Sequence, residues 1–204
     1  MHNQERNTDA CERVLVAAQR LFAQRGYTAV TLRDIAAEIG IRHASLYHHV
    51  PGGKEELFIA VTERTLIHHR QGLSRIIAET GPDIRTQLHA IADWLLSQPP
   101  IDLLRMMHSD MPAIDPAHAE RLERMAYESM IVPIMQALHQ AQQRGEINHH
   151  NLGLIAGGIL GIIESLHAVP VHTVTQSRQH MAYELIDALI DGIGCHAPSA
   201  AAED

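Results

Sequence analysis

Apolar residues recur at helical spacing along most of this chain of 204 residues. The first clear stretch places Val14, Ala17, Ala18, Leu21 and Phe22 at positions i, i+3, i+4, i+7 and i+8, which form one face of an α-helix. No segment shows the period-two alternation of a half-buried strand. Aromatic residues make up only 3 % of the chain, so aliphatic side chains and methionine must fill the core. We therefore expect an all-α fold with about nine helices.

Glycine, proline and capping residues divide the N-terminal part into short helices. Gly26 predicts the end of the first helix. Thr31, followed three residues later by Asp34, predicts the start of a second, short helix that ends at Gly40. Residues 42–50 leave room for only two helical turns before Pro51. This succession of helix, tight turn and short helix is typical of a helix-turn-helix.

The same signals continue toward the C-terminus. They predict further helices over residues 53–78, 83–97, 115–144, 151–168 and 176–193. Pro133 falls inside one of these segments and should kink it. The last residues, 197–204, are expected to form a disordered tail.

Charge is distributed unevenly. Residues 1–60 contain seven basic and seven acidic residues, whereas residues 61–204 contain nine and seventeen, which accounts for the whole net charge of −8. A neutral N-terminal module could approach an anionic polymer, and the acidic remainder would be repelled by it.

Two observations bear on location. The longest apolar run, residues 152–163, has twelve residues, fewer than the ~18 of a membrane span. Cys11 and Cys195 lie near opposite ends of the chain, without metal-type spacing or a disulfide framework. We expect a reduced cytoplasmic protein without a membrane partner.

Residues 26–61, GYTAVTLRDIAAEIGIRHASLYHHVPGGKEELFIAV, resemble the DNA-binding domain of the TetR family of bacterial transcription regulators. The resemblance rests on Gly26-Tyr27, the threonine that opens the second helix, a small residue before Leu46-Tyr47, and the Lys-Glu-x-Leu that opens the fourth helix. It implies a DNA-binding domain over residues 1–60, with its core at 9–58. Val50 departs from the pattern, because the family usually has phenylalanine there.

The expected DNA contacts combine a helix tip with polar groups that reach bases or phosphates. They are Thr31, Arg42, His43, Ala44, Ser45, Tyr47, His48 and Lys54. Leu46 should point inward and hold this helix against Leu32 and Ile35. Lys54 is the only lysine among 16 basic residues. At the start of a helix its ammonium and the helix dipole would act on the same phosphate.

For residues 61–196 the resemblance implies a helical domain that binds an effector and forms a homodimer. The candidate effector pocket comprises His89, Trp94, Leu104, Met107, His108, Met111, Tyr127, Met130 and His167. Methionine suits such a pocket because it adapts to varied apolar ligands. The alternative is that the methionines are ordinary core residues.

A stripe of small residues supports the dimer independently. Gly153, Gly157, Gly161 and Ser165 follow one another at intervals of four, which lets another helix approach closely. The partner helix would present Met181, Leu185 and Leu189. The stripe could instead serve packing within one subunit.

The resulting hypothesis is a ligand-responsive transcriptional regulator, most simply a repressor that a small molecule releases from a palindromic operator in double-stranded DNA. No enzymatic motif, metal site or cofactor is expected. One alternative is a metal- or haem-responsive regulator that uses His108, Asp110, Asp115 and His118. Another is a helical binding protein or enzyme that has lost DNA binding.

Overall fold

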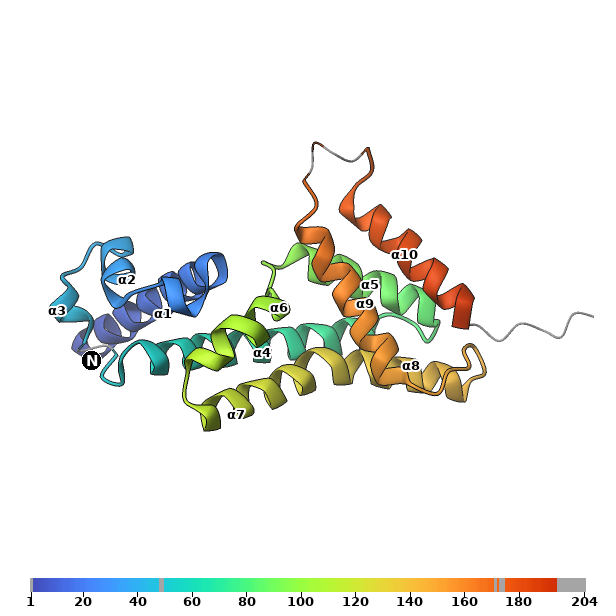
Figure 1. Cartoon of the computed structure of the whole chain (residues 1–204), viewed down its shortest axis with the longest axis horizontal. Coiled ribbons are helices and arrows are strands. Elements are labelled where there is room, and N and C mark those ends of the chain that lie inside the picture. Colours follow the sequence, from blue (N-terminus) through green and yellow to red (C-terminus); the bar gives the residue numbers. More distant parts are fainter. Residues whose placement is uncertain (1, 48–49, 171, 173–174, 194–204) are drawn as a thin grey trace, which may run out of the picture. The chain divides into compact units, whose positions relative to one another are not determined.

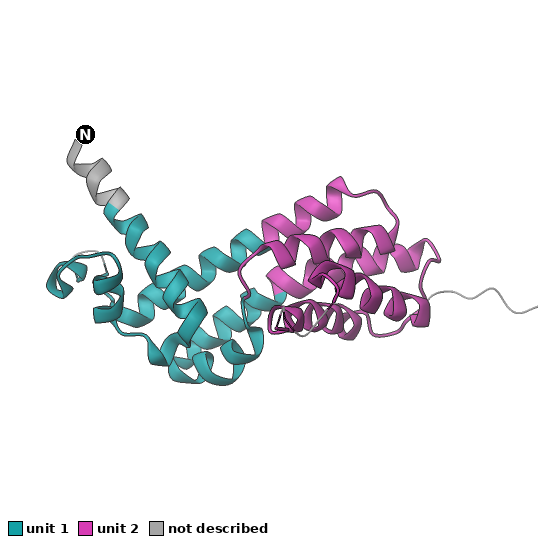
Figure 2. Ribbon diagram, turned by 90° about the horizontal axis from the view of Figure 1, so that it is seen from above, with its two compact units in different colours: residues 1–69, 101–127 teal, residues 70–100, 128–204 magenta. Residues whose placement is uncertain are grey.

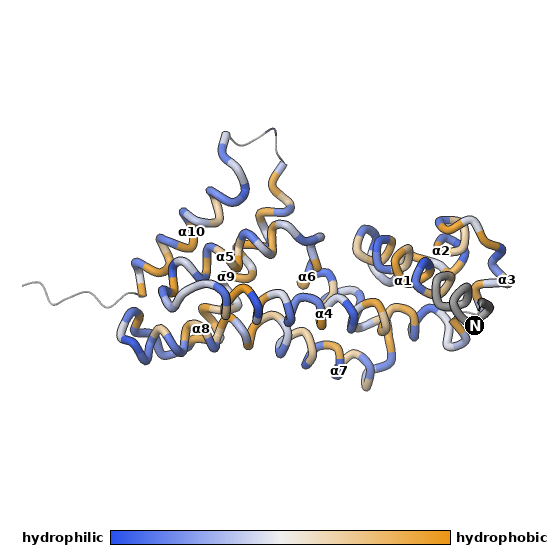
Figure 3. Tube along the Cα trace, turned by 180° about the vertical axis from the view of Figure 1, so that it is seen from behind, coloured by the Kyte–Doolittle hydropathy of each residue, from blue (hydrophilic) through white to orange (hydrophobic). Residues whose placement is uncertain are grey.

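The computed structural model describes residues 2–47, 50–170, 172 and 175–193, with side chains from residue 10 onward. Within these ranges the chain forms helices and no β-strand, which confirms the all-α prediction (Figure 1). Orange and blue positions alternate along most of the longer helices in Figure 3, as expected for amphipathic helices with one buried face. The expected disordered tail and His48 lie outside the described residues.

The chain divides into two compact units, coloured separately in Figure 2. The first comprises residues 1–69 and 101–127, and the second comprises residues 70–100 and 128–204. The predicted division near residue 60 concerns which residues bind DNA and which bind an effector, and it stays a prediction.

The first unit contains the predicted helix-turn-helix. Its elements are α1 (His2–Ala29), α2 (Leu32–Glu38), α3 (His43–Leu46), the first part of α4 (Gly53–Glu79), α6 (Leu103–Arg105), the π-helical turn η1 (Met106–Asp110), the 3₁₀ turn η2 (Met111–Ala113) and α7 (Pro116–Ala126). Helix α3 is shorter than the predicted two turns, because regular helical structure ends at Leu46.

The regular helix that begins α1 is broken at Gly26, as predicted from the sequence, and beyond this kink a second short helical segment continues to Ala29. Gly26 has φ 78° and ψ 168°, a conformation open almost only to glycine. Arg105 donates hydrogen bonds from its guanidinium to the carbonyl oxygens of Phe22 (3.2 Å) and Ala23 (2.9 Å), which lie just before the bend. The bend therefore keeps its backbone partners although the helix is interrupted.

The core of the first unit is built around three aromatic rings. Phe22 meets Phe58 edge to face at 5.3 Å between centroids, and Tyr27 lies 4.8 Å from Phe58. Leu46 is fully buried, as predicted, and so is Ile35 of α2, whereas Leu32 is half-buried. Helices α2 and α3 pack together, and the contact of Leu46 with these two side chains stays a prediction.

The second unit is a bundle of longer helices. It contains the remainder of α4, α5 (Ile84–Ser97), most of the π-helical turn η3 (Tyr127–Ile131), α8 (Val132–Gln143), α9 (Leu152–His167) and α10 (Arg178–Ile193). Asp83 caps α5 through the backbone N–H of Thr86 at 2.8 Å, at the predicted helix start.

The predicted kink at Pro133 takes a different form. The helix that begins at Pro116 is interrupted by the π-helical turn Tyr127–Ile131, and Pro133 lies at the second position of the next helix. Proline lacks an N–H and its ring clashes with the carbonyl of the preceding turn. The helical backbone runs without a break from Pro116 to Gln143, so the disturbance that the proline predicts is the π-helical turn directly before it.

Candidate nucleic-acid interface

The start of α2 is organised by a capping box. The Thr31 hydroxyl accepts from the backbone N–H of Asp34, and the Asp34 carboxylate accepts from the backbone N–H of Thr31 at 2.8 Å. The hydrogen bonds from the Thr31 hydroxyl and N–H lower the pKa of Asp34 below its ordinary value. The box fixes a helix N-terminus whose threonine side chain remains exposed.

Helix α3 exposes polar side chains and is anchored in the core by one buried residue, Leu46. Leu46 is fully buried, whereas Ala44 and Ser45 are exposed and Tyr47 is 50 % exposed. The ring of His43 meets the ring of Tyr47 edge to face, with 5.2 Å between centroids. Such a pair holds both rings on one side of a short helix.

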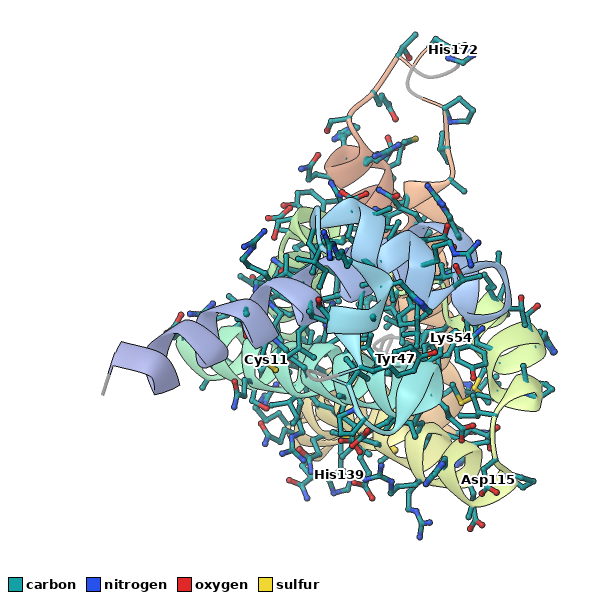
Figure 4. The ribbon with its side chains drawn as sticks, turned by 90° about the vertical axis from the view of Figure 1, so that its left-hand side faces the viewer. Cys11, Tyr47, Lys54, Asp115, His139 and His172 are labelled. Carbon is teal, nitrogen blue, oxygen red and sulfur yellow. The ribbon has the colours of Figure 1, made fainter. Side chains whose placement is uncertain are left out.

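An open groove joins these two helix ends to the start of α4. It has a volume of about 400 Å³ and is lined by Val30, Thr31, Leu32, Arg33, His43, Tyr47 and Lys54. Tyr47 and Lys54 are labelled in Figure 4. Two of the lining side chains, Arg33 and Lys54, are basic and none is acidic, so the groove suits an anion such as a phosphate.

Four of the eight predicted DNA contacts line this groove: Thr31, His43, Tyr47 and Lys54. Arg42, Ala44 and Ser45 are exposed but do not line it. Sequence reasoning missed Arg33. Its position between Thr31 and Asp34 was a usable signal, because the second residue of a capped helix lies close to the unpaired N–H groups of the first turn.

Lys54 has partners that the sequence did not reveal. Its ammonium donates to the backbone carbonyl of Tyr27 at 2.9 Å and lies 4.0 Å from the centroid of the Tyr27 ring. Burial lowers the pKa of Lys54, and burial together with the charge of Glu55 raises the pKa of Tyr27. The lysine therefore stands in the groove already attached to the end of α1.

The acidic and histidine residues of the metal alternative have separate partners. Asp110 is buried and accepts from the N–H of Tyr27, while Asp115 caps α7 through the N–H of Ala117. His118 bonds to Glu55 at 2.8 Å, and His108 is exposed. Among the described residues no group of three or more histidine, cysteine or carboxylate side chains is arranged to hold a metal ion.

The nine predicted pocket residues fall in both units. In the first unit Leu104 is 74 % exposed, Met107 and His108 are also exposed, and so is Tyr127, whereas Met111 is buried in the core. Exposed apolar side chains are available to a ligand or a partner. Met111 fits the alternative that a methionine simply fills the core.

In the second unit the remaining four have different environments. Met130 is fully buried, and His89 stacks on Tyr183 with 4.1 Å between ring centroids. Trp94 is half-buried. Burial and the charge of Arg178 lower the pKa of His167. The pocket formed by these residues stays a prediction.

A cleft of about 490 Å³ lies within the second unit, and none of the nine residues lines it. Its walls are Ser74, Ile77, Ala78, Thr80, Gly81, Pro82, Gln87, Pro133, Gln136, Ala137 and Gln140. Gln87 is 4 % exposed, and its amide nitrogen donates to the carbonyl oxygens of Ile77 and Thr80. The amide oxygen of Gln87 accepts no hydrogen bond from any described residue.

The predicted dimer stripe on α9 has open space beside it. A methyl group placed on Gly157 would meet only the Ile131 side chain, at 3.9 Å, and one on Gly161 would meet nothing within 4 Å. Ser165 is exposed, as are Leu154 on α9 and Leu185 on α10. Met181 and Leu189 are half-buried. Packing within the unit therefore does not require glycine at 161.

None of the helices in the described ranges combines the length and the apolar character needed to cross a membrane.

Comparison with known proteins gives consistent results for the N-terminal part. Residues 14–61 match the family model for bacterial regulatory proteins of the tetR family. The chain is 41 % identical over 66 residues to the HTH-type transcriptional regulator LmrA of Bacillus subtilis, a match that covers 32 % of this chain and 35 % of the relative. It is 25 % identical over 130 residues to the repressor AcnR of Corynebacterium diphtheriae, covering 57 % and 65 %. The first of these matches thus spans about a third of the relative.

Solved structures extend the likeness of the fold to most of the chain. AibR, crystallised with isovaleryl coenzyme A and operator DNA, has a TM-score of 0.72 at 18 % identity, and the match covers 88 % of this chain and 97 % of AibR. A transcriptional regulator from Saccharomonospora viridis in complex with choline has a TM-score of 0.69 at 24 % identity, covering 93 % and 100 %. With the capped α2, the anchored α3 and the family match, residues 14–61 are a DNA-binding segment of the type found in bacterial regulatory proteins of the tetR family.

Proposed function

We propose that this protein is a homodimeric transcriptional repressor that binds a palindromic operator and releases it when a small molecule binds. The observation that carries the proposal is the groove lined by Thr31, Arg33, His43, Tyr47 and Lys54, whose lining contains two basic residues and no acidic one. Hydroxyl and cationic groups at a helix N-terminus are the donors that bind DNA phosphates, and they set the register of the protein on the duplex.

Sequence specificity would come from α3. Its exposed side chains stand on a helix end whose only buried residue is Leu46, so Arg42, His43 and Ser45 can reach base edges. A helix-turn-helix reads one half-site, and two half-sites about 34–36 Å apart require two linked readers. The open glycine stripe on α9 supports a second subunit as the link.

Two observations support a small-molecule effector: the ligands of similar solved structures and a cleft in the second unit. AibR was crystallised with an acyl coenzyme A and the Saccharomonospora viridis regulator with choline, so related folds accept small molecules of different charge. The cleft of the second unit is a candidate site in this chain, because it has a volume in the range of ligand pockets and a buried amide acceptor that receives no hydrogen bond from the described residues. That acceptor favours a ligand with a hydroxyl or N–H donor.

The proteins matched by sequence are transcriptional regulators. We propose that this chain likewise acts by binding and not by catalysis. Effector-dependent release would then be a shift in population toward a state whose two DNA-binding domains no longer fit the half-sites.

The test measures binding of the protein to the DNA just upstream of its own gene. The affinity is determined by fluorescence anisotropy at several salt concentrations. Lys54→Ala should weaken binding to operator and random DNA alike, roughly tenfold at 0.1 M salt, and should reduce the salt slope by about one. Tyr47→Ala should also weaken binding. Arg124→Ala is the matched control, since it removes an exposed cation of the same unit on α7. Unchanged affinity and salt dependence in both groove variants would refute the proposed interface.

A further inference from the structure

Both polar backbone groups of Tyr27, its N–H and its carbonyl oxygen, form hydrogen bonds with side chains. Its N–H donates to the Asp110 carboxylate at 2.8 Å, and its carbonyl oxygen accepts from the Lys54 ammonium at 2.9 Å. The residue is 8 % exposed, so both bonds are protected from water on at least one side. Two hydrogen bonds therefore connect residue 110 to a residue that lines the groove, within one compact unit.

Asp110 is itself fixed. It is 3 % exposed, and a buried carboxylate is stable only with compensating partners. Its second oxygen lies 3.7 Å from Nε of Arg105, whose guanidinium also bonds to two carbonyl oxygens of α1. Gly26 leaves space for this arrangement, because a methyl group there would lie 3.1 Å from the Asp110 oxygen. Asp110 and Arg105 thus both stabilise the bend of α1 at Gly26.

Lys54 gains a defined position from Tyr27. A lysine side chain is long and flexible, and an unrestrained one loses much rotamer freedom when it binds a phosphate. The ammonium has three donors, and the Tyr27 carbonyl takes one of them. The other two remain for an anion in the groove, so the lysine can keep its protein contact while it binds.

The first turn of α4 has a second attachment to the same part of the chain. Glu55 accepts from the backbone N–H of Asp115 at 3.0 Å and bonds to His118 at 2.8 Å. These two hydrogen bonds lower the pKa of Glu55, with the His118 bond the larger cause. Residues 54 and 55 are therefore each tied, directly or through Tyr27, to residues 110–118.

We propose that Asp110 is a positioning residue for the phosphate contact of Lys54, acting through the backbone of Tyr27. This inference rests on the proposed function. Asp110 lies outside residues 14–61, the segment that the family model matches, so the match alone does not assign it a role in DNA binding. Residues 105–110 set the affinity of the groove because they fix the residue to which Lys54 is anchored.

The first experiment needs no DNA. Coupling is reciprocal, so removing Lys54 must loosen the bond between Tyr27 and Asp110. Lys54→Met replaces a half-buried residue near the surface, and the variant is expected to fold. Its Tyr27 amide should exchange with solvent about threefold faster or more in hydrogen-exchange NMR. An unchanged Tyr27 exchange rate, with the α9 amides as reference, would overturn the proposal.

The second experiment is a double-mutant cycle in operator affinity. Asp110→Ala should lower the affinity about threefold to tenfold in the wild-type background. In the Lys54→Met background the same substitution should change it by less than about twofold, because its route to the groove is already broken. An equal loss in both backgrounds would mean that Asp110 does not act through Lys54.

Two controls complete the cycle. Asp110→Asn keeps an acceptor for the Tyr27 N–H and should stay within about twofold of wild type. Glu120→Ala removes an exposed negative charge from the same unit and corrects for charge alone. If the wild-type protein bound no operator, the proposed function would fail, whereas the exchange experiment would still decide the link between Lys54 and Asp110.

Discussion

The two compact units reach stability by different means. The first contains both phenylalanines and three of the four tyrosines, and its centre is the contact of Phe22, Tyr27 and Phe58. The core of the second is aliphatic, with Leu88, Ile91 and other leucine and isoleucine side chains fully buried. Aromatic rings pack at specific angles, while aliphatic cores tolerate repacking. The aromatic core should therefore keep the side chains of the first unit in fixed positions. The aliphatic core of the second unit should tolerate small changes in packing.

The second unit adds a polar array between α5 and α10. Residues spaced by four on each helix face one another: Arg85, His89 and Asp93 on α5, and Tyr183, Asp187 and Asp191 on α10. Hydrogen bonds from Arg85 and His89 keep the pKa of Asp187 below its ordinary value, although burial opposes them. Only Ala182, Ile186 and Ile190 of α10 are buried, so this array matters for the position of the helix.

The largest expected effects come from the two cores. Phe58→Ala should lower the free energy of unfolding by about 3–5 kcal/mol, because it removes a ring with two aromatic neighbours. Leu88→Ala, its counterpart in the second unit, should cost about 2–5 kcal/mol. Urea unfolding measures both.

Conservative changes separate the two kinds of core. Phe58→Leu forfeits the aromatic contacts, worth about 0.5–1.5 kcal/mol beyond the buried area, whereas Leu88→Met should cost less than about 1.5 kcal/mol in total. If Phe58→Leu proved as mild as Leu88→Met, the first unit would not depend on ring geometry.

Contacts between residues close together in the sequence could be predicted, whereas contacts between residues far apart in the sequence could not. The capping box of Thr31 and Asp34 and the burial of Leu46 were predictable, because their signals lie within a few residues. The hydrogen bond between Tyr27 and Asp110 joins residues that are 83 positions apart in the sequence, and no local pattern predicts it. For the same reason the partner of Lys54 could not be found, although its unusual identity was evident.

The interrupted helix near Pro133 illustrates a different limit. Proline predicted a disturbance, but its form depends on how the preceding turn is packed. Ser129 and Met130 in the π-helical turn are both fully buried, so tertiary contacts help to set that geometry. The pocket residues were chosen by residue type, and type does not decide between a buried Met111 and an exposed Met107.

A pair of glycines gives the next largest difference. Gly26→Ala should cost about 3 kcal/mol, because its backbone angles are strained for any other residue and the added methyl group would press on Asp110 and Arg105. Gly145 in the second unit also has a positive φ of 77°, but a methyl group there meets nothing within 4 Å. Gly145→Ala should cost only about 1–2 kcal/mol. Equal losses in urea unfolding would show that the contacts at Gly26 contribute little.

The two helix caps should separate stability from binding. Thr31→Ala and Asp83→Ala each remove a side chain that caps a helix, and each should cost about 1 kcal/mol of stability. Only Thr31 lines the groove, so only Thr31→Ala should weaken operator binding. Thr31→Ser keeps the hydroxyl and should restore both properties. A comparable loss of DNA affinity in Asp83→Ala would contradict the assignment of the groove.

The smallest effect concerns the tyrosines at alkaline pH. Burial, followed by the hydrogen bond to Asp93, raises the pKa of Tyr183 from 10 to about 12. A raised tyrosine pKa stabilises the fold fully below pH 10, and this contribution is lost as the pH rises from 10 to 12. Because the tyrosine is only partly buried, solvent screening should limit the contribution to about 1 kcal/mol or less.

Tyr183→Phe should remove that part of the alkaline decline in stability and the tyrosinate absorbance change that titrates near pH 12. Tyr27 provides the comparison in the first unit, since burial, followed by the charge of Glu55, raises its pKa. Tyr27→Phe should therefore leave the Tyr183 transition in place. If Tyr183→Phe left the alkaline decline unchanged, the hydrogen bond to Asp93 would contribute little to holding α10 on α5. The position of α10 would then rest on its three buried side chains and the ion pairs of Arg85.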